Sequence, residues 1–105
     1  LHYNPVEVNI NMTPRPSVSV VIPTYNRAAF VCEAIDSVLS QTYSDRELIV
    51  VDDGSTDNTR HVLSAYGDVL KYIHTCHGGP GAARNRGIEA AGGQYIASIK
   101  IIVTE

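Results

Sequence analysis

The sequence has few cysteines, no long apolar run and no strong charge of either sign. Its two cysteines, Cys32 and Cys76, form no CxxC pair, which favours reduced thiols in a cytoplasmic protein. A net charge of −3 gives no basic footprint for nucleic acid. No apolar run approaches the roughly 20 residues of a membrane-spanning helix. Because 44% of the residues are hydrophobic and 18% charged, the sequence predicts a globular domain instead of a disordered chain.

The first 16 residues predict an N-terminal tail. They contain Pro5, Pro14 and Pro16, which disfavour regular structure. They lack the charged segment and apolar core of a signal peptide. The expected domain therefore comprises residues 17–105.

Apolar segments alternate with helical ones through the rest of the chain. The strands are expected at residues 17–22, 47–52, 70–75 and 95–103, and the helices at residues 28–42, 57–66 and 82–91. Such alternation predicts parallel βαβ units with right-handed crossovers. The predicted fold class is α/β, with an open, mostly parallel twisted sheet and helices on both faces. Ligands of such sheets bind beyond the carboxyl ends of the strands.

Three loops at that edge carry candidate side chains. Tyr25, after the first strand, has a flat face that suits a base, although a Tyr in a turn is also often a plain surface residue. Asp52 and Asp53 end the second strand, where a carboxylate can accept from a base imide or a ribose hydroxyl. Local turn and capping roles are the alternative for both aspartates.

The third loop, HGGPGAARNRG, places glycines before a helix. Free N–H groups and the helix dipole at such a point favour a phosphate, and Arg84 suits a bidentate phosphate contact. The loop matches neither GxGxxG nor GxxxxGK[ST], so it is not specific by itself. The adjoining segment HTCH does not readily supply the four ligands of a metal site. The sequence contains no GxSxG motif, so a nucleophilic hydrolase has no support.

Taken together, the motifs resemble a known family. VSVVIPTYNR, AIDSVLSQTYSDRELIVVDDGSTDNT and GPGAARNRGIEAAGGQYIA resemble the start of a family 2 glycosyltransferase with the Rossmann-like GT-A fold. The resemblance extends from Ser17 to about Ala97. It implies glycosyl transfer from a nucleotide-diphospho-sugar, most often a UDP-sugar, to an acceptor.

The resemblance also implies roles for individual residues. Those at the donor are Pro23, Thr24, Tyr25, Asp52, Asp53 and Arg84. The first three would form the base pocket, with Tyr25 packing on the ring. Asp53 would bind the base, Asp52 would support its loop or the ribose, and Arg84 would lie near the diphosphate.

The sequence departs from the family pattern at its last strand. The family has an Asp-x-Asp there that holds Mg²⁺ or Mn²⁺ against the diphosphate, whereas Lys100 and Ile102 stand at those positions. We therefore expect no metal and no catalytic residue in this chain. The acceptor half and its general base are also missing from the pattern. The expected behaviour is weak nucleotide binding with little or no glycosyl transfer, because the chain resembles only the N-terminal half of such an enzyme.

Two other classes remain. The apolar IASIKIIV predicts an exposed sheet edge that associates with a second copy, as in a non-catalytic, homo-oligomeric binding module. A receiver-type signalling domain would need an Asp after a later strand. The third strand ends in IHTCH, which contains no Asp, so the sequence disfavours this class.

Overall fold

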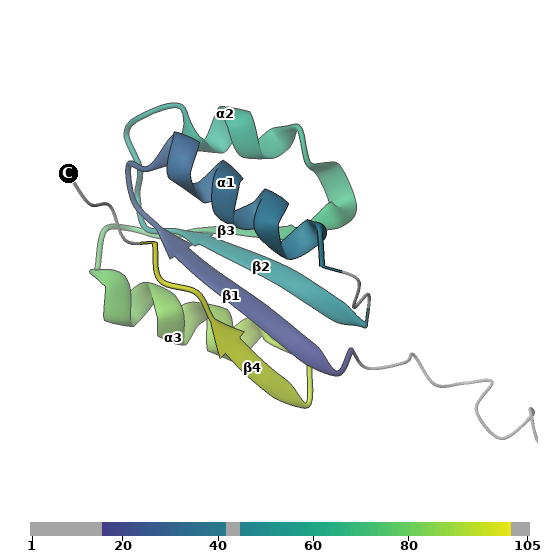
Figure 1. Cartoon of the computed structure of the whole chain (residues 1–105). Helices are drawn as coiled ribbons and strands as arrows, with labels where there is room; N and C mark the ends of the chain where they lie inside the picture. Colours follow the sequence, from purple (N-terminus) through teal and green to yellow (C-terminus); the bar gives the residue numbers. More distant parts are fainter. Residues whose placement is uncertain (1–15, 42–44, 102–105) are drawn as a thin grey trace, which may run out of the picture.

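The computed structural model describes residues 16–41 and 45–101, and within them it contains one four-stranded sheet. The strands are β1 (Val18–Thr24), β2 (Arg46–Asp52), β3 (Lys71–His74) and β4 (Tyr95–Ser98). They are all parallel and lie in the order β3-β2-β1-β4 (Figure 1). The predicted α/β class is confirmed. The predicted tail, apart from Pro16, and the predicted strand residues 102–103 lie outside the described residues.

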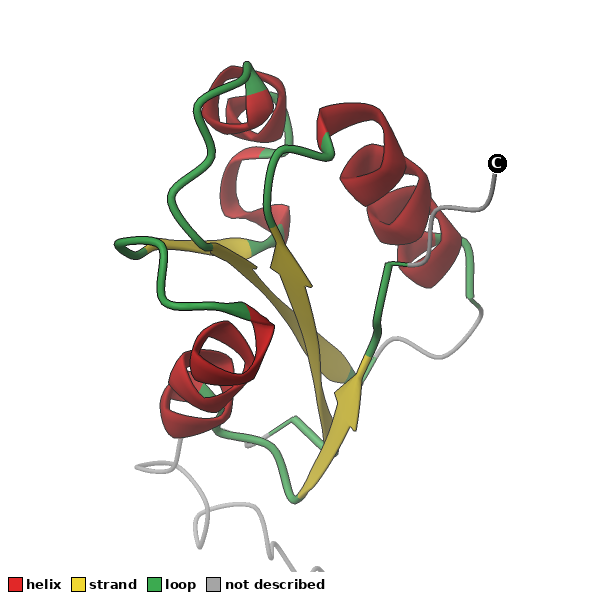
Figure 2. Cartoon of the chain, turned by 90° about the vertical axis from the view of Figure 1, so that its left-hand side faces the viewer, coloured by secondary structure: helices red, strands yellow, loops and turns green. Residues whose placement is uncertain are grey.

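Helices cover both faces of the sheet, as predicted. α1 (Ala28–Leu39) and α2 (Thr59–Ser64) lie on one face, and α3 (Pro80–Ala90) lies on the other (Figures 1 and 2). A 3-10 helix, η2 (Gly67–Val69), leads from α2 towards β3. None of the helices in the described ranges is long and apolar enough to cross a membrane.

Alternation along the two central strands divides the core into two layers. Val20 and Ile22 of β1 belong to the cluster beneath α1 and α2, whereas Val21 between them packs towards α3. This is the period-two alternation of a sheet buried on both faces. α1 packs on the sheet through Val31, Ile35 and Val38. Their spacing of four and three residues places them on one face of the helix. The apolar pattern of the sequence therefore fixes which face each helix covers.

A polar cluster fixes the turn that leads into β4. The cluster lies near the amino ends of β1 and β2, opposite the predicted ligand loops. The Glu47 carboxylate accepts from the Ser19 hydroxyl and from the Gly92 N–H, while the Gly93 N–H donates to Ser19 Oγ at 2.8 Å. A Cβ on Gly93 would lie 2.7 Å from the backbone nitrogen of Ser19. Glycine is therefore required where this turn passes β1.

The strand predicted at residues 95–103 is shorter in the structure, because β4 ends at Ser98. The Ile99 N–H still donates to the Val21 carbonyl at 2.9 Å. Residues of a parallel strand bond to a given neighbour at every second position, so the next donor from β1 to β4 would be Pro23. Proline has no N–H, so this bond of the ladder is missing where β4 ends.

The second helix also differs from the prediction of residues 57–66. α2 covers only Thr59–Ser64, and its N-cap residue, Asn58, makes no side-chain capping bond. Asp57 instead accepts from the Thr59 N–H at 3.0 Å. An Asp side chain bonding to the backbone two residues later is a local turn, which delays the start of the helix.

Two glycines in α3 predict opposite effects of the same substitution. A Cβ on Gly87 would lie 2.4 Å from Val21 Cγ1, whereas Gly81 has nothing within 4 Å of the added atom. We expect Gly87→Ala to lower the free energy of unfolding by about 1–3 kcal/mol through overpacking. Gly81→Ala is expected to raise it by up to about 1 kcal/mol through helix propensity. Urea denaturation of both variants measures the two changes, and equal effects would contradict the close approach of α3 to β1.

Candidate nucleotide-binding site

A cleft of about 480 Å³ opens at the carboxyl ends of the strands. Its walls come from the end of β1 and the loop after it, from Asp53 after β2, from the loop and first turns of α3 after β3, and from residues 98–101 at and beyond the end of β4. Five of the six residues assigned to the nucleotide-sugar line it: Pro23, Thr24, Tyr25, Asp53 and Arg84. The sixth, Asp52, is buried behind the cleft. The topology thus brings together segments that are far apart in the sequence.

Asp53 is the centre of this edge of the sheet. Its carboxylate is buried, and Oδ1 accepts from the Gly78 N–H at 2.9 Å and from Thr75 Oγ1 at 3.0 Å. Oδ2 accepts from the Gly79 N–H at 2.8 Å and lies 3.1 Å from His77 Nδ1. Burial by itself would raise the pKa of Asp53. The hydrogen bonds and the nearby imidazole more than offset burial and hold the pKa below its ordinary value.

Asp52 supports the loop from behind. Its Oδ1 accepts from the Ser55 N–H at 3.0 Å, and its Oδ2 accepts from the Tyr72 hydroxyl at 2.6 Å. Burial, and then the hydrogen bond to Asp52, raise the pKa of Tyr72. Support of the loop and contact with the ribose were the two roles predicted for Asp52. These contacts are those of a residue that supports the loop.

Asn26 joins the first and second loops, and the sequence analysis did not single it out. Its φ is +50°, in the left-handed region that Asn tolerates better than most residues. The side-chain oxygen accepts from the Thr56 N–H at 2.7 Å and the Asp57 N–H at 3.2 Å, and the Asn26 N–H donates to Ser55 Oγ at 2.8 Å. The sequence feature that could have indicated this role is an Asn in a turn directly after a strand, next to Tyr25.

Thr24 presents a polar atom that needs a partner. Its side chain is buried, and its hydroxyl finds no hydrogen-bond partner among the described residues. A buried hydroxyl without a partner is unfavourable by roughly 1–3 kcal/mol. Because Thr24 lines the cleft, a bound ligand is one way to satisfy this hydroxyl.

Positive charge gathers on the cleft walls. Arg84 lines it from α3, as predicted, and Arg27 and Lys100 join it from the loops after β1 and β4. The glycine loop differs from the expectation that its free N–H groups meet a phosphate, since Gly78 and Gly79 donate to Asp53. The attraction for a phosphate therefore comes from side chains instead of from these two backbone groups.

Comparison with known proteins agrees with this arrangement. The family model for glycosyl transferase family 2 matches residues 19–99. The chain belongs to this family. A glycosyltransferase of Rickettsia felis is 49% identical over 84 residues, which are 78% of this chain and 14% of that protein. EpsJ, a glycosyltransferase of Bacillus subtilis, is 42% identical over 87 residues, 80% of this chain and 25% of that protein.

Solved structures that are about 30% identical to this chain share its fold. Staphylococcus aureus TarS in complex with UDP superposes with a TM-score of 0.73 at 33% identity, over 81% of this chain and 27% of that one. Glucosyl-3-phosphoglycerate synthase of Mycobacterium tuberculosis, in complex with Mn²⁺, UDP and glucosyl-3-phosphoglycerate, gives 0.66 at 31% identity, over 82% and 33%. The 105-residue chain spans about a seventh to a quarter of the length of the first curated relatives it matches.

The donor atoms of this family 2 cleft do not suit the Mg²⁺ or Mn²⁺ that the family implies. Among the described residues lining the cleft, Asp53 alone is acidic, and both of its oxygens already accept hydrogen bonds. No group of three or more His, Cys, Asp and Glu within the described ranges could hold an ion. Lys100 lines the cleft where the first metal-binding carboxylate was expected, and Ile102 lies outside the described residues.

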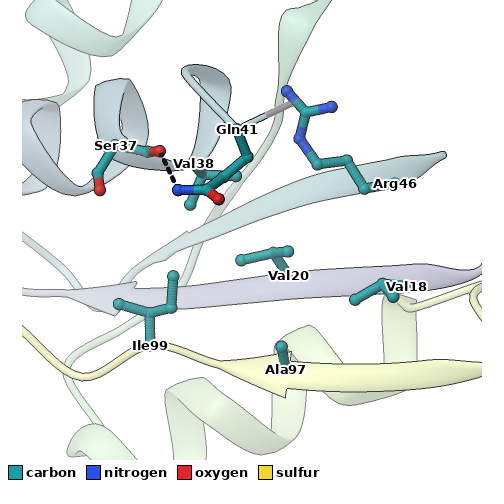
Figure 3. Close-up of a pocket in the computed structure, with 8 residues that line it drawn as sticks. All are labelled: Val18, Val20, Ser37, Val38, Gln41, Arg46, Ala97 and Ile99. Atoms are coloured by element: carbon teal, nitrogen blue, oxygen red, sulfur yellow. Dashed lines mark hydrogen bonds between the residues drawn. The ribbon is translucent and has the colours of Figure 1, made fainter. Parts of the chain in front are cut away.

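A second hollow, of about 330 Å³, lies on the α1 side of the sheet (Figure 3). Val18, Val20, Ala97 and Ile99 form its apolar floor, beneath α1. Gln41 Nε2 donates to the Ser37 carbonyl at 3.3 Å above this floor. The hollow therefore offers an apolar surface, and Arg46 also belongs to its lining.

The hydrogen bonds of Asp53 predict a pH-dependent stability. Because the folded-state pKa is below the ordinary value of 3.8, the carboxylate stabilises the fold above that pH. This contribution is lost as the pH falls through the lower folded-state pKa. We expect Asp53→Asn to lower the free energy of unfolding at pH 7 by about 1–3 kcal/mol. Its loss of stability below about pH 4 should be smaller than that of the wild type.

Urea denaturation at pH 7 and at several lower pH values tests this prediction. Asp68→Asn in η2 is the control, because Asp68 is exposed and lies outside the cleft. Parallel acid profiles for the wild type and Asp53→Asn would contradict the role given to this carboxylate.

Proposed function

We propose that this chain is the nucleotide-binding part of a family 2 glycosyltransferase and binds a nucleotide-diphospho-sugar, with UDP as the nucleotide, in the cleft beyond the strands. Thr24 carries the proposal, because it lines the cleft and its buried hydroxyl has no hydrogen-bond partner among the described residues. Tyr25, 38% exposed beside it, offers a ring for the base. Complexes of TarS with UDP and with UDP-GlcNAc support the choice of nucleotide.

The diphosphate is assigned to the basic side of the cleft. Arg84 on α3 and Lys100 after β4 line opposite parts of the wall, and their charges attract phosphate oxygens. A divalent cation normally bridges such oxygens and stabilises the leaving group. Since the described lining residues do not suit that ion, we propose weak binding that scarcely depends on Mn²⁺ or Mg²⁺, and little or no glycosyl transfer. The cytoplasmic location stays a prediction.

Calorimetric titration with UDP, with and without Mn²⁺, tests the proposal. We expect Arg84→Ala to weaken UDP binding by roughly tenfold, the effect of losing one charge-assisted hydrogen bond. Mn²⁺ should change the affinity of the wild type by less than about twofold, because the described residues that line the cleft offer no free carboxylate.

Arg86→Ala provides the matched control in the same helix. Arg86 is exposed, lies 3.8 Å from Glu89 and does not line the cleft, so its loss should leave the affinity unchanged. Absence of UDP binding to the wild type would refute the proposed function. Strong binding only with Mn²⁺ would refute the metal-independent part alone.

A second candidate function is self-association through β4. This strand is at the edge of the sheet, all four of its residues are exposed, and the exposed fractions of Tyr95 and Ile96 are 68% and 44%. An uncovered edge presents unpaired backbone groups to another chain. We propose that a second copy pairs with it in a homo-oligomer.

Light scattering at high protein concentration tests this candidate. A dimer or larger species is expected, and Ile96→Lys should shift it towards the monomer, since a charge on an edge opposes pairing. Val69→Lys in η2 is the control, because Val69 is 54% exposed and lies away from the edge. A wild-type protein that stays monomeric would rule this candidate out.

A further inference from the structure

His77 makes two contacts in the cleft that its own loop does not require. Its ring stacks on Tyr25 with the centroids 4.2 Å apart and the planes inclined by 25°. Its Nδ1 lies 3.1 Å from Asp53 Oδ2 and 3.2 Å from the Asp53 carbonyl. Tyr25 and Asp53 are two of the residues that the family resemblance assigns to the base of the nucleotide.

The imidazole resembles a base in the features that these contacts recognise. Both are flat heteroaromatic rings, and both carry a ring N–H that can donate to a carboxylate. Stacked aromatic pairs typically have centroids about 4.5–7 Å apart. At 4.2 Å, the rings of Tyr25 and His77 are in direct contact, so a base cannot enter between them.

The side chain of His77 can leave without unfolding the loop. It is 58% exposed, whereas the backbone beside it is fixed by the bonds from the Gly78 and Gly79 N–H groups to Asp53. A change of rotamer would therefore free one face of Tyr25 and one acceptor position on Asp53. The remaining three hydrogen bonds of the carboxylate would stay in place.

We infer that His77 occupies the base position of the nucleotide-free cleft and must move out when the nucleotide binds. The inference rests on the proposed function and adds a residue that limits affinity. Since binding then requires a conformation from which His77 has left, the apparent affinity is lowered by the fraction of molecules in that conformation.

The test compares UDP binding to three proteins by calorimetry. His77→Ala is expected to bind UDP roughly twofold to tenfold more tightly than the wild type, the range that one stacked aromatic pair supplies. His74→Ala is the matched control. His74 is exposed at the end of β3, its ring is 6.4 Å from that of Tyr72, and it does not line the cleft, so its loss should leave the affinity unchanged.

Proton NMR of the wild-type protein supplies a second measurement that needs no substitution. Nuclear Overhauser contacts between the rings of His77 and Tyr25 are expected in the free protein and should vanish when UDP saturates the cleft.

The outcomes separate the two proposals. Equal or weaker UDP binding by His77→Ala, or ring contacts that persist in the complex, would overturn this inference and leave the proposed function standing. Weaker binding would mean that His77 is part of the wall on which the base rests. Tighter UDP binding by His77→Ala than by the wild type would support both proposals, and binding to neither protein would overturn both.

Discussion

The buried carboxylate of Asp53 is the interaction on which the cleft depends. It follows a central strand and accepts from two backbone N–H groups and a hydroxyl of the loop after β3, and His77 Nδ1 of the same loop lies 3.1 Å from it. Removing a carboxylate from water is unfavourable unless such donors replace the water. The loop therefore has to fold around Asp53, and in doing so it sets the start of α3, from which Arg84 reaches the cleft.

Asn26 has the corresponding role between the loops that follow β1 and β2. Its side-chain oxygen and backbone N–H bond to the turn after β2, and its left-handed backbone turns the chain from β1 into α1. Short polar side chains thus fasten three loops from distant parts of the sequence at one edge of the sheet. This framework places Tyr25 and Thr24 on the wall of the cleft. His77, in contrast, is placed where it uses two of the groups that a ligand needs.

Most of the fold was predictable because it follows from local patterns. The apolar runs around Val20 and Val50 predict two buried strands, and the spacing of Val31, Ile35 and Val38 predicts the helical face that covers them. The end of the last strand was not predictable from its own residues, since Tyr95 to Val103 is uniformly favourable for a strand. It ends early because Pro23, more than 70 residues away in the sequence, is its neighbour across the sheet and has no N–H to donate.

The sequence by itself determined the α/β class, the edge of the sheet where a site would form and the family to which the chain belongs, because each is written in local periodicity or in contiguous motifs. Only the tertiary structure decided how the site residues divide their work. It turned Asp52 to support the loop behind the cleft, gave all the acceptor positions of Asp53 to the next loop, and stacked His77 on Tyr25. Apart from the bond between Asp52 and Ser55, these contacts join residues 20 to 52 positions apart in the sequence. No motif specifies which donor reaches which acceptor until the strands bring these segments together.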